Sequence, residues 1–385
     1  MGVIEVVEPG VLTTVQDLGR HGYLRLGVPA SGAMDLFALR VANILVGNPE
    51  GEACLEITVL GPRLQFLSDA LIVLTGADLA PLLDGDPVPM WESVAAYRGN
   101  ILSFQGPREG SRSYLAVAGG FDVPVVMGSK STYLKAGLGG FKGRSLRAGD
   151  TLLTPIPTPP LHLAGRRTPR GLIPHYGYQH PLRVITGPQD DAFTDRGIET
   201  FLSSSYTITA QSDRMGYRLE GPKIGHKAGP DIISDGIPFG GVQVAGDGQP
   251  IVLMADRGTS GGYTKIATVI SADLSDLAQG MPGDRVSFKS VSIEQAHEAL
   301  RQQEATLSRL KELLAAPIAA RQFRILVEGD VYNVSVEMTR SPSTEDGPRA
   351  SASGRVRLVS ESGEIRSYGV DVEAKEEVED HGTEG

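Results

Sequence analysis

The stretch YLAVAGGFDVPVVMGSKSTY, residues 114–133, has a counterpart in IVLMADRGTSGGYTKIATVI, residues 251–270, and this pair decides the fold. Each stretch begins with an apolar run typical of a buried strand, then enters a loop rich in Gly, Ser and Thr that leads to a tyrosine. A Gly-Asp turn and a last strand follow in both, as LRAGDTL (146–152) and MPGDRVSF (281–288). The repeat indicates two related halves.

The remaining sequence can be arranged around this repeat. We expect a first half over 3–155, a Pro- and Gly-rich linker over 156–180 and a second half over 181–290. Short apolar runs bounded by Gly, Pro or Asp predict many strands, whereas 35–47 predicts a helix that begins at Asp35 and stops at Gly47. Shorter helices are predicted over 190–203 and 271–280. Two such halves predict a mainly β fold of paired barrels or sandwiches, with a shared cleft between them.

The end of the chain follows a different pattern. Residues 291–316 contain an amphipathic helix, because Leu, Ala and Ile fall on one stripe of 293–315. Alternating residues over 321–373 predict a small β extension, with a first hairpin over 321–338 and a second pair of strands over 354–360 and 364–373. The acidic residues 374–385 are interpreted as a solvated tail.

Composition excludes several classes of function. The 385 residues carry a formal net charge of −10 and a pI of about 5.3, which argues against a nucleic-acid partner or an anionic membrane surface. The N-terminus lacks the pattern of a signal peptide, and no apolar run is long enough to span a membrane. We therefore expect a cytoplasmic protein. The only cysteine, Cys54, lies in an apolar run and is predicted to be a core residue.

Two glycine-rich loops, 240–250 and 257–265, are the strongest candidates for a site. Backbone N–H groups in such loops can stabilise an oxyanion or hold a carboxylate, although tight barrel turns would need the same glycines. Polar side chains that could act on a ligand gather around these loops: Gln243, Gln249, Asp256, Arg257, Tyr263 and Lys265. Arginine suits a carboxylate, and a partly buried lysine suits acid–base chemistry. Simpler roles are a local Asp256–Arg257 salt bridge and a surface position for Gln243.

Two further segments combine polar residues with glycine. SDRMGYRLEGP (212–222) places Arg214 and Tyr217 where they line a polar pocket or, alternatively, point outward from an edge strand. In the first half, 13–23 and 28–35 contain a polar set, of which the two aspartates are also natural capping residues: Gln16, Asp17, Arg20, Ser31 and Asp35. The histidines are scattered and only one cysteine is present, so no metal site is predicted.

Several longer blocks together resemble a known family. They are PGVLTTVQDLGRHGY, GVPASGAMD, ANILVGN, GPQDDAF, SDRMGYRLEGP, the repeat stretch 114–133, and SDGIPFGGVQVAGDGQPIVLMADRGTSGGYTKIATVISADL. Over about residues 3–290 the chain resembles allophanate hydrolase subunit 2 proteins, the family that includes the C-type subunit of bacterial ATP-dependent 5-oxoprolinase. It is similar also to the carboxyltransferase domain of biotin-dependent urea carboxylase. The resemblance implies two tandem cyclophilin-like β-barrel domains, followed by the helix and the small C-terminal β-hairpin extension.

The resemblance also implies a function within a complex. A subunit 1 homologue, similar to the B-type subunit of 5-oxoprolinase, and a third protein, similar to its A-type subunit, would act with this chain. Together they would hydrolyse 5-oxoproline to glutamate, using ATP at a site that the sequence does not reveal. One alternative is a carboxyltransferase of a urea carboxylase or allophanate hydrolase type. Biotin would then sit on another protein, because Lys375 lacks flanking methionines. The other alternative is a regulatory binding partner of a subunit 1 homologue.

The leading hypothesis assigns roles to the candidate residues. The catalytic set is Lys265, Tyr263, Asp256 and Arg257. The substrate-binding set is Gln243, Gln249, Arg214, Tyr217, Gly261 and Gly262. The substrate would be a small amide or lactam, and the general acid and base stay unassigned.

Overall fold

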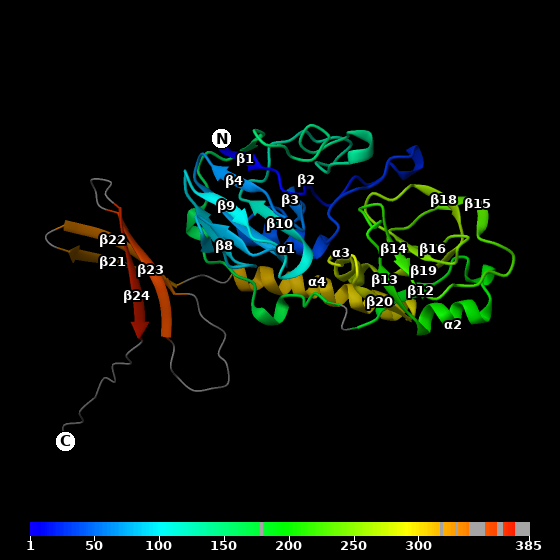
Figure 1. Cartoon of the computed structure of the whole chain (residues 1–385). Helices are drawn as coiled ribbons and strands as arrows, with labels where there is room; N and C mark the ends of the chain where they lie inside the picture. The colour runs from blue at the N-terminus through cyan, green and yellow to red at the C-terminus, as the bar shows by residue number, and fades with distance from the viewer. Residues whose placement is uncertain (178–179, 316–318, 328–329, 339–350, 360–364, 374–385) are drawn as a thin grey trace, which may run out of the picture. The chain divides into compact units, whose positions relative to one another are not determined.

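The computed structural model describes residues 1–177, 180–315, 319–327, 330–338, 351–359 and 365–373, the last four ranges as backbone only. The chain divides into two units, Met1–Leu314 and Ala315–Gly385, and Figure 1 draws both. The first unit contains both halves of the repeat, the linker and most of the long helix.

The first half consists of two hydrogen-bonded sheets around one core. The six-stranded sheet has the order β11 (Thr151–Thr154), β1 (Gly2–Glu8), β4 (Arg63–Phe66), β9 (Ile101–Phe104), β6 (Pro81–Leu83), β7 (Asp86–Pro87). The five-stranded sheet has the order β2 (Leu12–Gln16), β3 (Cys54–Thr58), β10 (Glu109–Val117), β5 (Ala70–Asp78), β8 (Ser93–Ala96). Both sheets contribute side chains to the same buried cluster, so they enclose it together.

The helix α1 (Leu36–Val46) covers the outer face of the five-stranded sheet. Its bounds confirm the sequence prediction: the Asp35 carboxylate accepts a hydrogen bond from Ala38 N, and Gly47 ends the helix with a φ of 82°. Strand β5 is buried on both faces, because Leu71 packs toward α1 while Ile72 packs between the sheets. Cys54 is buried in the α1 cluster, as predicted for a core residue.

The second half is a closed barrel of seven strands. The order is β12 (Leu182–Thr186), β19 (Lys265–Val269), β16 (Gly241–Val244), β17 (Pro250–Leu253), β14 (Gly216–Glu220), β13 (Ser205–Ile208), β20 (Arg285–Ser290). Parallel pairing of β12 with β20 closes it. The two-stranded ribbon of β15 (Asp231–Gly236) and β18 (Ser260–Tyr263) forms a separate sheet beside the barrel. Helix α2 (Asp195–Ser203) is capped at its N-terminus by Thr194, whose hydroxyl accepts a hydrogen bond from Gly197 N.

These observations confirm the mainly β fold with two β-rich halves. The halves differ in closure, since only the second forms a fully hydrogen-bonded barrel among the described strands. The short helices are shorter than predicted. Residues 190–203 contain a 3-10 turn before α2, and 271–280 contain a 3-10 turn before α3 (Leu274–Ala278).

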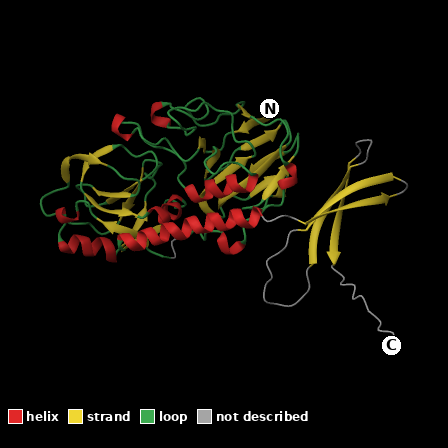
Figure 2. Ribbon diagram, turned by 180° about the vertical axis from the view of Figure 1, so that it is seen from behind, coloured by secondary structure: helices red, strands yellow, loops and turns green. Residues whose placement is uncertain are grey.

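Helix α4 (Ile293–Ala315) packs against both halves. Its C-terminal part inserts Leu307 and Leu310 into the α1 cluster, and its N-terminal part packs Ala296 and Ala299 against Ile270. Figure 2 shows this long helix running beneath both halves. The helix therefore does more than separate the halves from the C-terminal extension, because it also holds them to each other.

The second unit contains two antiparallel hairpins. Strand β21 (Ala319–Val327) pairs with β22 (Asp330–Met338), and β23 (Ser351–Val359) pairs with β24 (Ile365–Glu373). These strands confirm the predicted β extension; the acidic tail 374–385 lies outside the described residues. No helix in the described part of the chain is both long and apolar enough to cross a membrane.

Candidate functional site

The two halves meet through buried side chains that cross the boundary between them. Met34, from the turn before α1, packs in the core cluster of the second half and is 1% exposed. Gln279, just after α3, reaches back into the first half, where its side-chain carbonyl accepts hydrogen bonds from the backbone of Ser111 and Arg112. Residues of both halves thus form one buried core at the boundary, and the polar side chains within it are held by hydrogen bonds to the opposite half.

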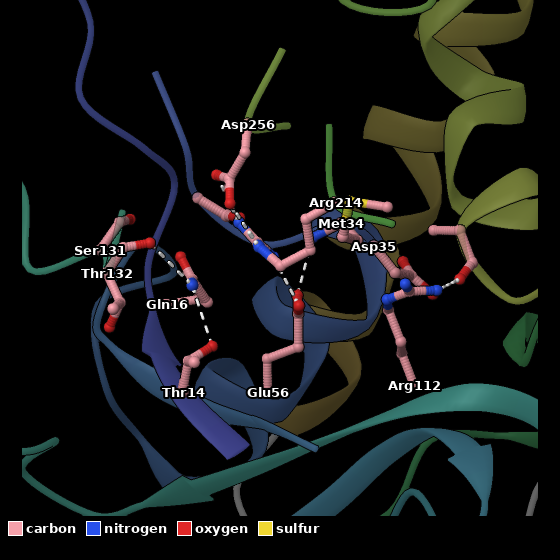
Figure 3. Close-up of polar contacts among 12 residues, drawn as sticks. Thr14, Gln16, Met34, Asp35, Glu56, Arg112, Ser131, Thr132, Arg214 and Asp256 are labelled. Carbon is pink, nitrogen blue, oxygen red and sulfur yellow. Dashed lines mark hydrogen bonds and ion pairs between the residues drawn. The ribbon is translucent and has the colours of Figure 1, made fainter. Parts of the chain in front are cut away.

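Arg214 is the central charge of this boundary. Its Nη1 donates to Glu56 Oε1 at 2.5 Å, and its Nε and Nη2 donate to the two carboxylate oxygens of Asp256 at 3.0 and 3.1 Å. Nη2 also donates to the Gly32 carbonyl at 2.7 Å. Figure 3 shows Arg214 between the two acids. Burial disfavours the charge, but Glu56 and Asp256 outweigh it and raise the pKa of Arg214 above its ordinary value.

A second buried guanidinium crosses the boundary beside it. Arg112 Nη1 donates to the Tyr217 hydroxyl at 2.6 Å and to the Ala278 carbonyl at 2.5 Å. The Arg112 guanidinium also lies 5.7 Å from the Tyr217 ring centre. Arg214 and Tyr217 are 5% and 2% exposed, so the alternative that placed both on the outside of an edge strand is wrong.

A cavity of about 570 Å³ opens between the halves. One wall comes from the first half and the other from the segments before β16 and after β17. The residues that line it are Leu24, Arg25, Gly27, Gly236, Ile237, Pro238, Thr259 and Ser260. The glycine-rich loop 257–265 therefore borders a cavity, and in place of a tight barrel turn its residues Ser260–Tyr263 form a strand of the ribbon.

Arg257 lies behind the wall made by Ile237 and Thr259. Its Nε donates to the Ile237 carbonyl at 3.0 Å, and its guanidinium lies 5.3 Å from the Phe239 ring centre. The expected local salt bridge with Asp256 is not formed, because Asp256 pairs with Arg214 instead. Burial lowers the pKa of Arg257 to about 10.

Lys265 lies at the base of the β15–β18 ribbon. Its side chain is 1% exposed, and its Nζ donates to Asp235 Oδ2 at 2.9 Å. Gln189 joins the same group, since its amide donates to Asp235 Oδ2 and accepts from Lys265 N. The pKa of Asp235 is lowered, chiefly by the hydrogen bond from Lys265. Tyr263, on the other ribbon strand, is 40% exposed.

The glycines of the ribbon are needed to different degrees. A Cβ at Gly261 would lie 2.8 Å from Gln243 Nε2 and 2.8 Å from Ile237 Cδ1, so the ends of these two side chains would have to move to accommodate it. At Gly262 the nearest atom, Ile232 O, would be 3.5 Å away. Gln243 is 6% exposed, which makes the surface-position alternative wrong, and its amide donates to the Tyr263 carbonyl at 3.3 Å.

The structure thus divides the predicted residues into three groups. Arg214, Asp256 and Tyr217 belong to the buried boundary. The larger group lies in the ribbon and in the segments beside it, and none of its members is among the residues that line the cavity: Gln243, Arg257, Gly261, Gly262, Tyr263 and Lys265. Gln249 belongs to neither, because its amide bonds both backbone groups of Gly221.

Sequence reasoning missed residues that complete these groups. Glu56 and Arg112 lie within strands whose sequences look like ordinary sheet segments. The one signal that could have identified them is a charged residue at a strand position where the alternating pattern predicts a buried side chain. Asp235 and Gln189 are distant in sequence from Lys265, and no local signal joins them. In the part of the chain with described side chains, no group of His, Cys, Asp or Glu is arranged to hold a metal ion.

The first-half polar segment packs beside the boundary. Asp17 accepts hydrogen bonds from Gly19 N and from the Ser129 hydroxyl, but no helix begins there, so the predicted capping role is wrong for Asp17 and the carboxylate ties two loops together instead. Arg20 is fully buried and donates to the Ser131 carbonyl at 2.8 Å. Asp256 acts electrostatically on Arg20 and on Tyr133, which places both near that carboxylate.

Comparison with known proteins identifies relatives along most of this chain. The C subunit of 5-oxoprolinase from Escherichia coli is 39% identical over 308 residues, which are 80% of this chain and 97% of that protein. The urea amidolyase of Saccharomyces cerevisiae is 34% identical over 80% of this chain, but only 18% of that protein is covered. The crystal structure of Kluyveromyces lactis urea carboxylase matches with a TM-score of 0.75 at 28% identity, over 94% of this chain and 34% of that one.

The family model described as carboxyltransferase domain, subdomain A and B, matches residues 26–290. That range includes both walls of the cavity except Leu24 and Arg25, and it includes every predicted site residue. This match covers more than half of the chain, and the bacterial relative is aligned over nearly its whole length. The chain therefore belongs to the family of carboxyltransferase domains, subdomain A and B.

Proposed function

We propose that this protein is the C-type subunit of an ATP-dependent 5-oxoprolinase complex that hydrolyses 5-oxoproline to glutamate. The observation that carries the proposal is the alignment with the C subunit of the Escherichia coli 5-oxoprolinase, at 39% identity over 97% of that protein. A second relative of the same type, from Haemophilus influenzae, is 38% identical over 99% of its length. The cytoplasm is the expected location.

The cavity between the halves is the proposed substrate site. Hydrolysis of a lactam adds a water oxygen to the carbonyl carbon, breaks the ring C–N bond and leaves a new carboxylate and an ammonium group that has taken up both protons of the water. Negative charge develops on the carbonyl oxygen during the addition, and donors arranged beforehand stabilise it. The proposal assigns this stabilisation to the N–H groups of Gly261 and Gly262, which follow the lining residue Ser260 on β18, and to Arg257 behind the same wall.

Asp256 has a different role in the proposal. Its carboxylate is held by two hydrogen bonds from Arg214, and Arg214 is held in turn by Glu56. A residue fixed in this way is suited to orient the loop that begins at Arg257. Tyr263 is the exposed hydroxyl of the ribbon, and we assign it to substrate or partner contact.

The proposal includes partners. A B-type protein, homologous to allophanate hydrolase subunit 1, and an A-type protein would complete the complex and supply the ATP-dependent step. Exposed apolar side chains occur in the segments that supply the cavity walls: Leu26, between the lining residues Arg25 and Gly27, is 64% exposed, and Ile233, on the strand that ends at Gly236, is 95% exposed. Side chains of this kind on both sides of a cavity favour a covering partner.

The test is reconstitution. The three purified proteins should hydrolyse ATP only when 5-oxoproline is present, and should release glutamate. Omission of this chain should abolish both signals. If ATP hydrolysis and glutamate release are the same with and without this chain, the proposal is wrong. A regulatory binding partner would instead form a tight complex without turnover.

The carboxyltransferase alternative has its own support in the similarity to urea amidolyase and urea carboxylase. It predicts that the purified chain and its partner move a carboxyl group from carboxybiotin, carried on another protein, to urea. Carboxylated urea formed in a mixture lacking 5-oxoproline would favour this activity over lactam hydrolysis.

A further inference from the structure

The walls of the cavity between the halves contain no group that can accept a proton at neutral pH. Among the described residues that line it, Arg25 is the only charged one, and Thr259 and Ser260 carry the only hydroxyl groups. The other five are glycines or apolar residues. An arginine side chain stays protonated in proteins and therefore cannot act as a base.

The two hydroxyl groups of the wall are not activated as nucleophiles. A serine or threonine hydroxyl attacks a carbonyl carbon when a neighbouring base takes its proton through a hydrogen bond. Within the part of the chain whose side chains the structure describes, neither Thr259 nor Ser260 has a side-chain hydrogen bond to a histidine, a lysine or a carboxylate. These hydroxyl groups can bind a ligand, but they have no base to start the reaction.

The ionisable groups behind the walls are held by one another. Asp256 accepts two hydrogen bonds from Arg214, and Lys265 donates to Asp235. Arg257, whose pKa is lowered by burial to about 10, is still a cation at neutral pH. It can stabilise negative charge on a carbonyl oxygen, but it cannot take a proton from water. The described part of this chain thus offers hydrogen-bond donors to the cavity and no free base.

Hydrolysis of a lactam requires such a base. The water oxygen bonds to the carbonyl carbon as a base takes one of the water protons. The same group can then deliver that proton to the ring nitrogen as the C–N bond breaks. The second water proton leaves the new carboxyl group and completes the ammonium group of the product. The group that carries the first proton has to come from outside the cavity walls.

The cavity is open on a side where another protein can reach it. Six of its eight lining residues are exposed. Leu26, between two lining residues of the first half, and Ile233, on the ribbon strand that leads to the opposite wall, are each more than half exposed. A protein surface laid across both segments would bury these apolar side chains and exclude water from the cavity.

The charge at the cavity indicates which group would enter with that protein. Arg25 is exposed and forms no ion pair with any residue whose side chain the structure describes. Its positive charge would repel a lysine or an arginine and would attract a carboxylate. The same charge would keep the carboxylate ionised, which is the form that accepts a proton. Charge complementarity therefore favours an aspartate or a glutamate.

We propose that the active site is shared, because a partner protein docks across the segments of Leu26 and Ile233 and inserts a carboxylate beside Arg25 as the general base. The inference rests on the proposed function and deepens it: the B-type protein of the complex is the partner, and it contributes to the hydrolytic step itself. This chain binds the lactam and stabilises the charge on its carbonyl oxygen. Neither protein hydrolyses the lactam alone.

Cross-linking locates the inserted group. Cys54 is the only cysteine and is buried, so Ser260→Cys places the one accessible thiol on the cavity wall. A photoreactive maleimide attached there should cross-link, in the reconstituted complex, to a peptide of the B-type protein that contains Asp or Glu. Arg63→Cys, in a separate cavity of the first half, is the control and should not label that peptide. No cross-link in a complex that forms, or a cross-link to the A-type protein or to a second copy of this chain, would overturn the inference.

Affinity measurements test the docking surface. Calorimetry gives the Kd of the B-type protein for wild type, Leu26→Ser and Ile233→Ser, and each substitution should weaken binding by about 10-fold or more. Val11→Ser is the matched control, because Val11 is 66% exposed and lies outside the segments that line the cavity. An unchanged Kd for both wall variants would contradict the proposed docking.

Kinetics test the base. Replacing the acidic residue of the cross-linked peptide by its amide should lower kcat for L-5-oxoproline by about 100-fold or more and leave the Kd between the subunits unchanged. Arg25→Gln should move the acidic limb of the pH profile of kcat upward, because the carboxylate loses the charge that keeps it ionised. Wild-type kcat after amide replacement of every acid in that peptide would overturn the inference.

These results are separable from a failure of the proposed function. If the complete complex does not hydrolyse 5-oxoproline at all, the proposed function fails. The cross-link from Ser260→Cys and the affinities of Leu26→Ser and Ile233→Ser require no turnover, so they decide in that case whether an acidic segment of the B-type protein docks at this cavity.

Discussion

Arg214 and Glu56 are 158 residues apart in sequence, and their side chains meet at 2.5 Å in the buried boundary between the two halves. Each half supplies one partner of this ion pair, and Asp256 completes it from the second half. The arrangement fixes the loop that begins at Arg257 relative to the first half. The cavity between the halves thus has walls whose relative position is set by buried charge.

The first prediction concerns the stability of this group. Arg214→Met should lower the free energy of unfolding by about 3–5 kcal/mol, because Glu56 and Asp256 are left buried without a cation. Chemical denaturation measures the loss. Arg257→Met is the matched control: it removes a buried arginine with no acidic partner, so its cost should be clearly smaller. Equal costs for both variants would contradict the account of the boundary.

A second prediction concerns pH. Burial alone would raise the pKa of Glu56, but Arg214 and Arg112 outweigh burial and bring it below the ordinary value of 4.5. As the pH falls below about 4.5, the unfolded chain binds a proton at this position before the folded one, so stability falls. The denaturant concentration at the midpoint of unfolding should therefore decline more steeply with falling pH in wild type than in Glu56→Gln. The difference should appear between roughly pH 5 and 3, the range expected for a carboxylate whose pKa is lowered in the folded state. Equal slopes in the two proteins would show that Glu56 contributes nothing to the pH dependence of stability.

Much of the fold follows from local signals in the sequence. The helix α1 begins after a capping aspartate and ends at a glycine with positive φ, and both signals are local. The alternating strands of the C-terminal extension are equally local. Barrel closure is not local, because β12 pairs with β20 across about a hundred residues. Sequence periodicity contains no information on that register.

The candidate site was predictable only in part for the same reason. The predicted loop 257–265 does border the cavity, through Thr259 and Ser260, whereas the lining segments 24–27 and 236–238 were not predicted to belong to a site. The partner of Asp256 could not, since Arg257 is its neighbour in sequence while Arg214 is its partner in space. Lys265 was expected to be available for acid–base chemistry, and the structure instead holds it against Asp235.

A third prediction tests the role of Lys265 in holding the ribbon. Lys265→Met keeps most of the buried side-chain volume but removes the hydrogen bond to Asp235. Amide hydrogen exchange in β15 should become faster, whereas exchange in β5 should not change. Asp235→Asn changes the other member of the ion pair, and it should also make amide exchange in β15 faster. Unchanged exchange in β15 in both variants would exclude this tether.

A fourth prediction concerns strain at Ser31. This residue has a φ of 53°, and its hydroxyl is buried without a hydrogen-bond partner. Ser31→Gly should stabilise the protein by about 1 kcal/mol, because glycine adopts positive φ without a Cβ clash and the unpaired hydroxyl is removed. Ser31→Ala keeps the backbone strain and should gain less in the same denaturation experiment. A glycine variant less stable than the alanine variant would contradict this explanation.

The central claim is that the cavity between the halves binds the substrate. Hydrogen exchange of the reconstituted complex, with and without saturating L-5-oxoproline, tests it most directly. The account predicts slower exchange on both walls, at residues 24–27, 236–238 and 259–260. A second cavity, in the first half and lined by Arg63, Asp84 and Ser103 among others, serves as the internal comparison and should be unaffected. Protection of that region, with no change on either wall, would contradict the account.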